Sequence, residues 1–251
     1  MRGGAQAHLI EADDGHFYVV KFSNNPQHRR ILVNELVASV FLSYLQIAAP
    51  PCAVVRLSAE FLEANPEVHL TLGSKRVAVP EGWHFGSRFP GHPERQAVYD
   101  FLPDALLPKV ENLADFLGIL AFDKWTGNAD SRQSIFFRAR LKEYMPSIAQ
   151  PLRVGYVALM MDHGFVFNGP NWDFIDSPLQ GLYFRQTVYS GIHSMADFEP
   201  WIERIRHFPE EVLDDAIKQV PPAWLTSSDD LEKLFGLLLR RRSRVADLIG
   251  E

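Results

Sequence analysis

The spacing of apolar residues changes near the middle of the chain. In the first hundred residues, apolar and polar positions alternate or form short apolar runs bounded by turn residues, which predicts strands. The expected strands cover residues 7–11, 16–22, 53–57 and 83–89. Asp13-Asp14-Gly15 should join the first two as a hairpin.

Helical spacing appears once in this first part and then dominates after residue 103. The expected helices cover residues 27–46, 113–125, 194–207, 209–220 and 229–249, and Ser58 should cap a short helix that ends before Pro66. Residues 70–80 and 179–189 fit no single pattern. The chain is therefore predicted to be α+β, with a β-rich N-terminal part and a mostly helical C-terminal part.

A polar loop interrupts the apolar run in the middle of the chain. The helix that ends near Trp125 breaks at Gly127-Asn128, and Asp130 precedes a strand-like run, Ile135-Phe136-Phe137. A second apolar strand ends at Asp162, and Gly164 should allow the sharp turn that aims this carboxylate into a cleft. A loop carboxylate, a strand and then Asp-x-Gly is typical of kinases, where one carboxylate orients the nucleophile and the other holds magnesium.

Two further charged residues fit this interpretation. Phe17, Val19 and Lys21 share one face of a strand, so Lys21 could reach a phosphate or simply guard a sheet edge. Glu35 lies at the edge of the buried stripe of its helix, where a carboxylate needs a cation unless it is solvated and paired locally. We expect Lys21 and Glu35 to form an ion pair.

Composition excludes several classes of protein. The 251 residues carry a formal net charge of −6 and no reader motif, so duplex DNA binding should be weak and non-specific. Neither a P-loop nor a zinc-binding motif is present. The single cysteine, Cys52, and the lack of a signal peptide or a membrane-length apolar run predict a cytoplasmic protein. The arginines at 240–242 and 244 should form a solvated face.

Five segments together resemble the HipA-like kinases of bacteria, in particular the compact branch without a partner-fusion N-terminal domain. The segments are Gly3-Gly4-Ala5-Gln6-Ala7-His8, Tyr18-Val19-Val20-Lys21-Phe22, Asn34-Glu35-Leu36, Asp123 to Asp130 and Asp162-His163-Gly164-Phe165. The resemblance runs along nearly the whole chain. It implies a bilobal protein-kinase-like fold, and the best-known members phosphorylate protein serine, some as toxins of toxin–antitoxin pairs.

The resemblance also implies ATP and Mg²⁺ as cofactors and a role for each segment. An N-lobe over residues 1–98 would carry Lys21 and Glu35, a hinge over 99–103 would lie beside adenine, and a helical C-lobe would cover 104–251. Asp130 would orient the substrate hydroxyl and Asp162 would hold magnesium. The residues expected to contact the nucleotide are Gly3, Gly4, Ala5, Gln6, Lys21, Tyr99, Phe101 and Leu102.

The sequence departs from the family pattern after Asp130. The family commonly has Asp-x-His followed by an Asn that binds the second metal, but this chain reads Ser131-Arg132-Gln133-Ser134, with Arg132 in the place of the His. Gln133 or Ser134 would then be the second metal ligand. Phosphate-covering loops normally join two strands, so the strand before Gly3 is missing or supplied otherwise.

The expected activity is therefore transfer of phosphate from ATP to a Ser or Thr hydroxyl of an unknown protein, with an antitoxin-like or regulatory protein as a further partner. Two alternatives stay open. One is a catalytically weak, kinase-like binding module, which Arg132 and Gln133 favour. The other is a kinase whose acceptor is a lipid or a small molecule.

Overall fold

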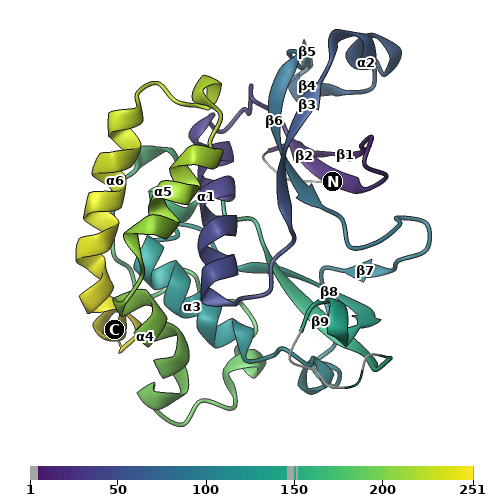
Figure 1. Cartoon of the computed structure of the whole chain (residues 1–251). Coiled ribbons are helices and arrows are strands. Elements are labelled where there is room, and N and C mark those ends of the chain that lie inside the picture. The colour runs from purple at the N-terminus through teal and green to yellow at the C-terminus, as the bar shows by residue number, and fades with distance from the viewer. Residues whose placement is uncertain (1–4, 146–149, 151, 251) are drawn as a thin grey trace.

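Two small sheets lie beside a helical body in the computed structural model of the chain (Figure 1), which describes residues 5–145, 150 and 152–250. The first sheet is antiparallel, with strand order β1-β2-β6-β3, and the second has the order β7-β8-β9. A separate hairpin, β4-β5, adjoins the first sheet. The strands are β1 His8–Glu11, β2 Phe17–Lys21, β3 Cys52–Leu57, β4 His69–Leu72, β5 Lys75–Ala78, β6 Gly82–Arg88, β7 Val98–Tyr99, β8 Gln133–Arg140 and β9 Val154–Met161.

Most of the helices in the described structure lie after residue 103, as the apolar spacing predicted. They are α1 Arg30–Leu45, α2 Ala59–Ala64, α3 Asp115–Thr126, α4 Glu199–Arg206, α5 Glu210–Gln219, α6 Ser228–Arg241 and α7 Val245–Gly250. Short 3₁₀ segments connect them. No helix in the described part of the chain is both long and apolar enough to cross a bilayer.

The two faces of the first sheet have different environments because strand side chains alternate. Val19 and Lys21 of β2 stand opposite Ser87 and Phe85 of β6, so these four side chains share the face directed at the helical body. On the other face, Tyr18 and Val20 pack beneath the β4-β5 hairpin in a small apolar core. That core consists of Ile10, Tyr18, Val20, Phe22, Leu57, Leu70 and Val79.

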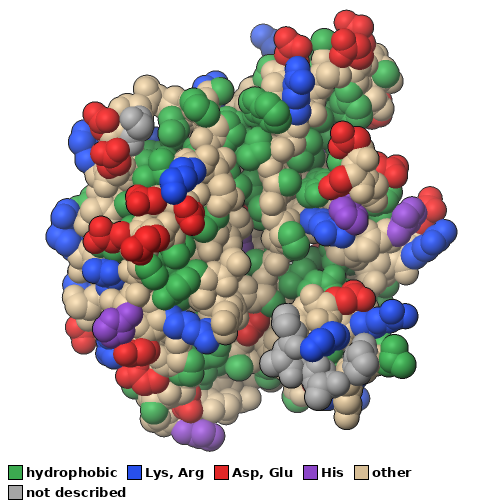
Figure 2. Space-filling view, viewed as in Figure 1, with side chains coloured by type: hydrophobic (Ala, Val, Ile, Leu, Met, Phe, Trp, Pro, Cys, Tyr) green, Lys and Arg blue, Asp and Glu red, His purple; other side chains and the backbone are tan. Residues whose placement is uncertain are grey.

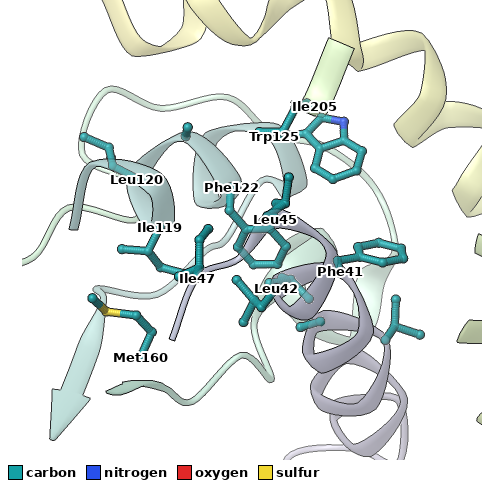
Figure 3. Packing of buried hydrophobic residues seen from close by; sticks show 14 of the residues in the cluster. Phe41, Leu42, Leu45, Ile47, Ile119, Leu120, Phe122, Trp125, Met160 and Ile205 are labelled. Carbon is teal, nitrogen blue, oxygen red and sulfur yellow. The ribbon is translucent and has the colours of Figure 1, made fainter. Parts of the chain in front are cut away.

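The helix α1 belongs to the core of the helical body. Its residues Phe41, Leu42 and Leu45 are fully buried against α3, where Phe122 and Trp125 point toward them (Figure 3). Both helices carry apolar residues around most of their circumference, which is typical of helices buried within a protein. The main core therefore joins α1, which comes early in the chain, to α3 and the C-terminal helices.

Most of the predicted elements are present. Ser58 caps α2, with its hydroxyl accepting a hydrogen bond from Phe61 N at 3.2 Å, and the ambiguous residues 70–80 form the β4-β5 hairpin around Gly73 in a left-handed conformation. The single helix expected over 229–249 is wrong, because a 3₁₀ segment, Arg242–Arg244, separates α6 from α7.

The solvated arginine face is also wrong in part. Arg241 is buried, pairs with Asp176, and donates hydrogen bonds to the backbone oxygens of Lys124 and Trp125 at the end of α3. Elsewhere on the helical body, acidic and basic side chains are intermixed on the face seen in Figure 2. That face carries no broad basic patch of the kind that binds a nucleic-acid backbone.

Candidate active site

Lys21 lies at the end of β2 between two carboxylates from other elements. Its ammonium group forms an ion pair with Glu35 of α1 and another with Asp162, whose Oδ1 is 2.8 Å from Lys21 Nζ. The ion pair predicted between Lys21 and Glu35 is confirmed. Asp162, which follows β9, joins the pair, so three segments far apart in the sequence meet at this point.

The three charges do not balance, because one cation serves two carboxylates. Burial disfavours the charged form of Lys21, but Glu35 and Asp162 outweigh it and hold the pKa of Lys21 above its usual range. Burial likewise acts against the charged form of Asp162, yet Lys21 keeps the pKa of that carboxyl below its usual value. Burial raises the pKa of Glu35, and Lys21 opposes the rise. Lys21 and Asp162 are therefore charged at neutral pH.

The helix α1 holds the Asp162 loop, residues 162–165, from one side. Glu35 Oε2 accepts a hydrogen bond from His163 N at 3.0 Å. The neighbouring Asn34 donates through Nδ2 to three backbone oxygens of the following segment, at 2.7 to 3.0 Å, those of Gly164, Val166 and Gly169. Asn34 and Glu35 thus fix the loop to the helix.

The turn after β9 is made by Asp162 rather than by Gly164. Asp162 has φ 57°, in the left-handed region, whereas Gly164 does not lie in that region. Aspartate tolerates this conformation better than most residues. Gly164 is needed for a different reason, since a Cβ there would lie 2.6 Å from Ile31 Cγ2 of α1. The expectation that Gly164 makes the turn is therefore wrong.

Asp130 lies on the neighbouring Asp130 loop, residues 127–132. It is exposed, and its Oδ1 accepts a hydrogen bond from Ser131 N at 2.7 Å. Two backbone hydrogen bonds tie this loop to the segment after β9, from Ala129 N to Phe165 O at 2.9 Å and from Asn168 N to Gly127 O at 3.1 Å. The two loops are thus held side by side.

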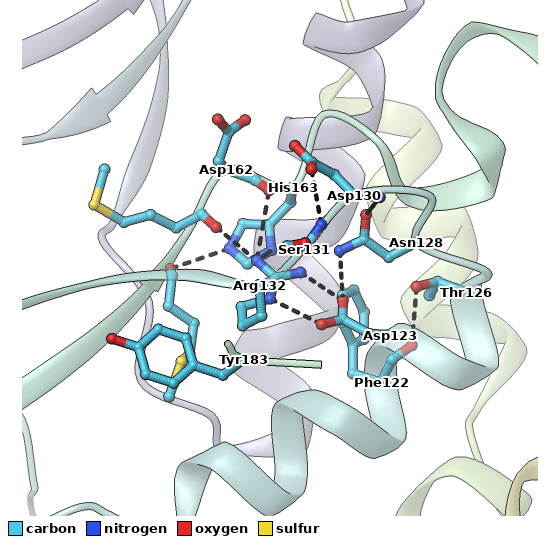
Figure 4. A network of polar contacts seen from close by, with 12 residues as sticks. Phe122, Asp123, Thr126, Asn128, Asp130, Ser131, Arg132, Asp162, His163 and Tyr183 are labelled. Atoms are coloured by element: carbon cyan, nitrogen blue, oxygen red, sulfur yellow. Dashed lines mark hydrogen bonds and ion pairs between the residues drawn. The ribbon is translucent and has the colours of Figure 1, made fainter. Parts of the chain in front are cut away.

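Arg132 is fully buried beneath both loops (Figure 4). Its Nε donates to Asp123 Oδ2 at 2.8 Å, and its Nη1 donates to Met161 O at 2.6 Å. Asn128 Nδ2 donates to the other oxygen of Asp123 at 3.0 Å. Sequence reasoning treated Arg132 as a departure at a catalytic position, but its guanidinium joins α3 to the end of β9. The signal that was missed is Asp123, a carboxylate within a mostly apolar stretch of helix, where it needed a buried cation.

A cavity of about 270 Å³ opens above these groups. It brings together six of the predicted residues with charged or amide side chains, together with a set of apolar residues that were not predicted as site residues. The polar ones are Gln6, Lys21, Glu35, Asp130, Gln133 and Asp162, and the apolar ones are Val19, Phe85, Met161 and Phe165. Other hollows in the described structure are larger, but none of them contains this charged cluster. The alternation of side chains along β2 places Val19 on the same face as Lys21. The pairing of β2 with β6 adds Phe85, which lies opposite Lys21.

The N-terminal segment only partly enters the described structure. Gly3 and Gly4 lie outside the described residues, whereas Ala5 and Gln6 line the cavity. Gln6 also binds the backbone of β4, where its Nε2 donates to Thr71 O and its Oε1 accepts from Thr71 N, both at 2.7 Å. The amide thus ties this segment to the β4-β5 hairpin.

The residues predicted to form the hinge do not line the cavity. Tyr99 belongs to β7, which pairs with β8 in the second sheet, and both Tyr99 and Phe101 are exposed. Leu102 is buried in the main core. Ser87 of β6 lines the cavity, but none of the described residues from the end of β6 through Leu102 does. A contact of Tyr99, Phe101 or Leu102 with adenine stays a prediction.

Of the two candidates for a second metal ligand, only Gln133 is at the cavity. Its Nε2 lies 3.3 Å from Asp162 Oδ2, whereas Ser134 faces the opposite side of β8, where its buried hydroxyl has no partner among the described residues. No group of three acidic, histidine or cysteine side chains suited to a metal occurs in the described part of the chain. Mg²⁺ usually binds one or two carboxylates together with substrate phosphates, so Asp162 fits that pattern, and the amide oxygen of Gln133 would be a neutral ligand beside it.

Comparison with known proteins places this geometry in a family. The family model described as HipA-like kinase matches residues 1–142, more than half of the chain. The crystal structure of the Golgi casein kinase with Mn/ADP bound is similar over 99% of this chain and 71% of that one, with a TM-score of 0.50 and 14% sequence identity. At that identity the likeness concerns the fold alone, and it confirms the predicted kinase-like α+β fold. A search of curated proteins finds no significant match. The chain belongs to the HipA-like kinase family.

Proposed function

We propose that this kinase uses Mg²⁺ and ATP to phosphorylate a Ser or Thr hydroxyl of a protein. The observation that carries the proposal is the position of Lys21 between Glu35 and Asp162, in one cavity with Asp130. Phosphoryl transfer asks the protein for positioning and charge neutralisation rather than covalent chemistry. A cation, a metal-binding carboxylate and an acceptor-orienting carboxylate are the groups that such a reaction needs.

Each group has a distinct proposed role. Lys21 would bind the nucleotide phosphates while Glu35 holds its ammonium group in place. Asp162 and the Gln133 amide would hold Mg²⁺, which supplies neutralisation of the phosphate charge when it is bound. Asp130 is exposed at the cavity and would orient the acceptor hydroxyl and take its proton.

The charge of the cluster argues that nucleotide binding depends on a divalent cation. Lys21 already serves two carboxylates, so a triphosphate placed beside Asp162 would meet a cluster in which one cation is shared between two carboxylates. A divalent cation at Asp162 would remove this repulsion and leave Lys21 free to pair with phosphate. The Mn/ADP present in the structurally similar Golgi casein kinase supports the same requirement here.

The rival function is a kinase-like module that binds a partner without efficient transfer. The sequence favours it at Arg132 and Gln133, and Arg132 stands in the place of a family histidine. Its guanidinium is buried and directed away from the cavity, where every nitrogen is hydrogen-bonded. The substitution therefore removes no charged group from the cavity, which favours the enzyme.

Nucleotide-dependent stabilisation combined with a transfer assay tests the proposal. ATP at about 100 times its Kd should add roughly 2.7 kcal/mol to the free energy of unfolding of the wild type when Mg²⁺ is present. Asp162→Asn should lose this gain. Asp130→Asn should keep the gain yet lose phosphate transfer, because Asp130 is proposed to act on the acceptor rather than the nucleotide.

The controls separate the alternatives. Chelating the metal with EDTA should abolish the gain in the wild type. Stabilisation by Mg-ATP without transfer to any protein, peptide or lipid would favour the binding module. If no nucleotide and metal stabilise the wild type, the proposed site is wrong.

A further inference from the structure

A second hollow, the apolar groove, lies beside the Asp130 loop. It has a volume of about 810 Å³ and is formed mainly by the segment that runs from Leu179 to Phe198. The side chains that matter here are Leu179, Leu182, Tyr183, Phe184, Tyr189 and Met195. None of the roles proposed for the active-site cavity uses this groove.

Large apolar side chains of the groove are open to solvent. Leu179 is 76% exposed and Phe184 is 68% exposed, while Met195 is 39% exposed. Single exposed apolar residues are ordinary, but a group of them around one hollow marks a surface that binds another molecule. The groove therefore has the character of a binding surface.

The groove begins at the loop that carries Asp130. Ser131 lines the groove and directly follows Asp130, which lines the active-site cavity. Arg132 N donates a hydrogen bond to Leu182 O at 3.3 Å, so the Leu179–Phe184 side of the groove is fastened to this loop. A chain lying in the groove would pass next to the carboxylate proposed to orient the acceptor hydroxyl.

The polar groups of the groove are uncharged. None of the described side chains that line it is acidic or basic, and its polar members are hydroxyl and amide groups. A ligand lying in the groove would therefore meet apolar side chains and neutral hydroxyl and amide groups, and no charged side chain among the described residues.

These features fit a peptide better than a membrane. An anionic lipid surface is recognised by clustered Lys and Arg, which the lining of the groove lacks. A peptide offers apolar side chains for Leu179, Phe184 and Met195, and backbone groups for the hydroxyls and amides. Ser131 lines the groove and follows Asp130, which lines the cavity, so a peptide that extends past Ser131 would bring its own hydroxyl close to Asp130.

We infer that the apolar groove binds the acceptor, as a peptide segment in which large apolar residues flank the Ser or Thr to be phosphorylated. This inference rests on the proposed function and adds the substrate class to it. It predicts that kinase activity depends on apolar side chains close to the acceptor and that charged side chains at those positions are rejected.

The test uses two sets of nine-residue peptides with a central Ser, flanked either by Leu and Phe or by Glu. The Leu/Phe peptides should be phosphorylated with kcat/KM values about ten-fold or more above those of the Glu peptides. Leu179→Glu should lower kcat/KM for the Leu/Phe peptides by about ten-fold while leaving the KM for ATP unchanged. Leu152→Glu is the matched control, since Leu152 is also 76% exposed but does not line the groove.

A binding measurement separates failure of the groove from failure of the proposed function. A fluorescein-labelled Leu/Phe peptide should bind the wild type and Leu152→Glu but not Leu179→Glu, as measured by anisotropy. Such binding without transfer would support the groove and contradict the kinase function proposed here. The inferred role of the groove would be wrong if phosphate transfer did not depend on the flanking residues, or if its rate fell equally in both variants. The proposed kinase function would not be affected by either result. Absence of peptide binding, or binding of phosphatidylcholine vesicles that Leu179→Glu abolishes, would also overturn the inference.

Discussion

Two ion-pair networks lie next to each other in this kinase, and they differ in burial and in charge balance. The open network joins Lys21 to Glu35 and Asp162, and the side chain of Asp162 is 36% exposed. The closed network joins Arg132 to Asp123, and both side chains are 0% exposed. In the open network one cation serves two carboxylates, whereas the closed network has one of each.

The difference shows how similar residues come to have different roles. Each nitrogen of the Arg132 guanidinium donates a hydrogen bond within the protein, so the closed network has nothing left with which to bind a ligand. The open network has an excess carboxylate and faces a cavity, so it can exchange partners when a metal and a phosphate arrive. Unequal charge and access to solvent therefore distinguish the proposed site from the support beneath it.

The largest expected effect comes from breaking the closed network. Arg132→Met leaves Asp123 as an unpaired buried carboxylate, which should lower the free energy of unfolding by about 3–5 kcal/mol. Urea unfolding followed by tryptophan fluorescence measures this loss. Arg206→Ala is the control, because its ion pairs with Glu199 and Glu203 are exposed and should contribute at most about 1 kcal/mol. Equal losses of unfolding free energy in the two variants would contradict the stabilising role of the closed network.

Breaking the open network should instead weaken the binding of the nucleotide. Lys21→Met should abolish the roughly 2.7 kcal/mol that Mg-ATP at about 100 times Kd adds to the free energy of unfolding. Lys75→Met, at an exposed position on strand β5, is the matched control and should keep the whole gain. A Lys21→Met variant still stabilised by Mg-ATP would remove Lys21 from the proposed site.

The contact between α1 and the Asp162 loop can be disturbed without changing any charge. Gly164→Ala places a methyl group 2.6 Å from Ile31 Cγ2 and should cost about 1–3 kcal/mol of stability through overpacking. Gly191→Ala is the control, since a Cβ there has nothing within 4 Å and the expected change stays within about 0.5 kcal/mol. Chemical denaturation compares the two, and indistinguishable stabilities would contradict the close approach.

His163 touches both networks and gives the smallest effect. Burial, followed by the charge of Arg132, lowers the pKa of His163 well below its ordinary 6.5. Below pH 6.5 the unfolded chain therefore binds a proton that the folded protein does not, so the free energy of unfolding falls as the pH falls. The contribution of His163 approaches about 1.4 kcal/mol per pH unit. His163→Gln should reduce the slope between pH 6.5 and 5 by up to that amount, as measured by urea unfolding at each pH, and an unchanged slope would contradict the neutral buried state.

The open network could be predicted from the sequence because local patterns encode it. Strand alternation placed Lys21 on an inward face, helical spacing placed Glu35 at the edge of a buried stripe, and Asp162 followed an apolar strand. Their meeting was predicted for Lys21 and Glu35, and it is confirmed. Only the addition of Asp162 to the pair required the structure.

The closed network could not be predicted in the same way. Arg132 lies in a polar stretch, and nothing in that stretch shows that the chain from Leu179 to Phe184 packs beside it. Its burial depends on tertiary contacts with Asp123, nine residues earlier, and with Met161 O, twenty-nine residues later. The turn at Asp162 was missed for a related reason. Glycine is the usual residue in a left-handed conformation, but Gly164, two residues after Asp162, is used for close packing instead.

The anchoring of α1 has a consequence for motion between the two parts of the molecule. Asn34 and Glu35 are hydrogen-bonded to the Asp162 loop, and α1 packs against α4 and α5, so Glu35 belongs to the helical body. Lys21 belongs to the four-stranded sheet, which has its own small core. If the sheet rotates against the body to admit or release a nucleotide, Lys21 is the part that travels. Movement of the sheet would then break and re-form the ion pairs of Lys21, while Glu35 and Asp162 keep their positions and α1 does not have to rotate.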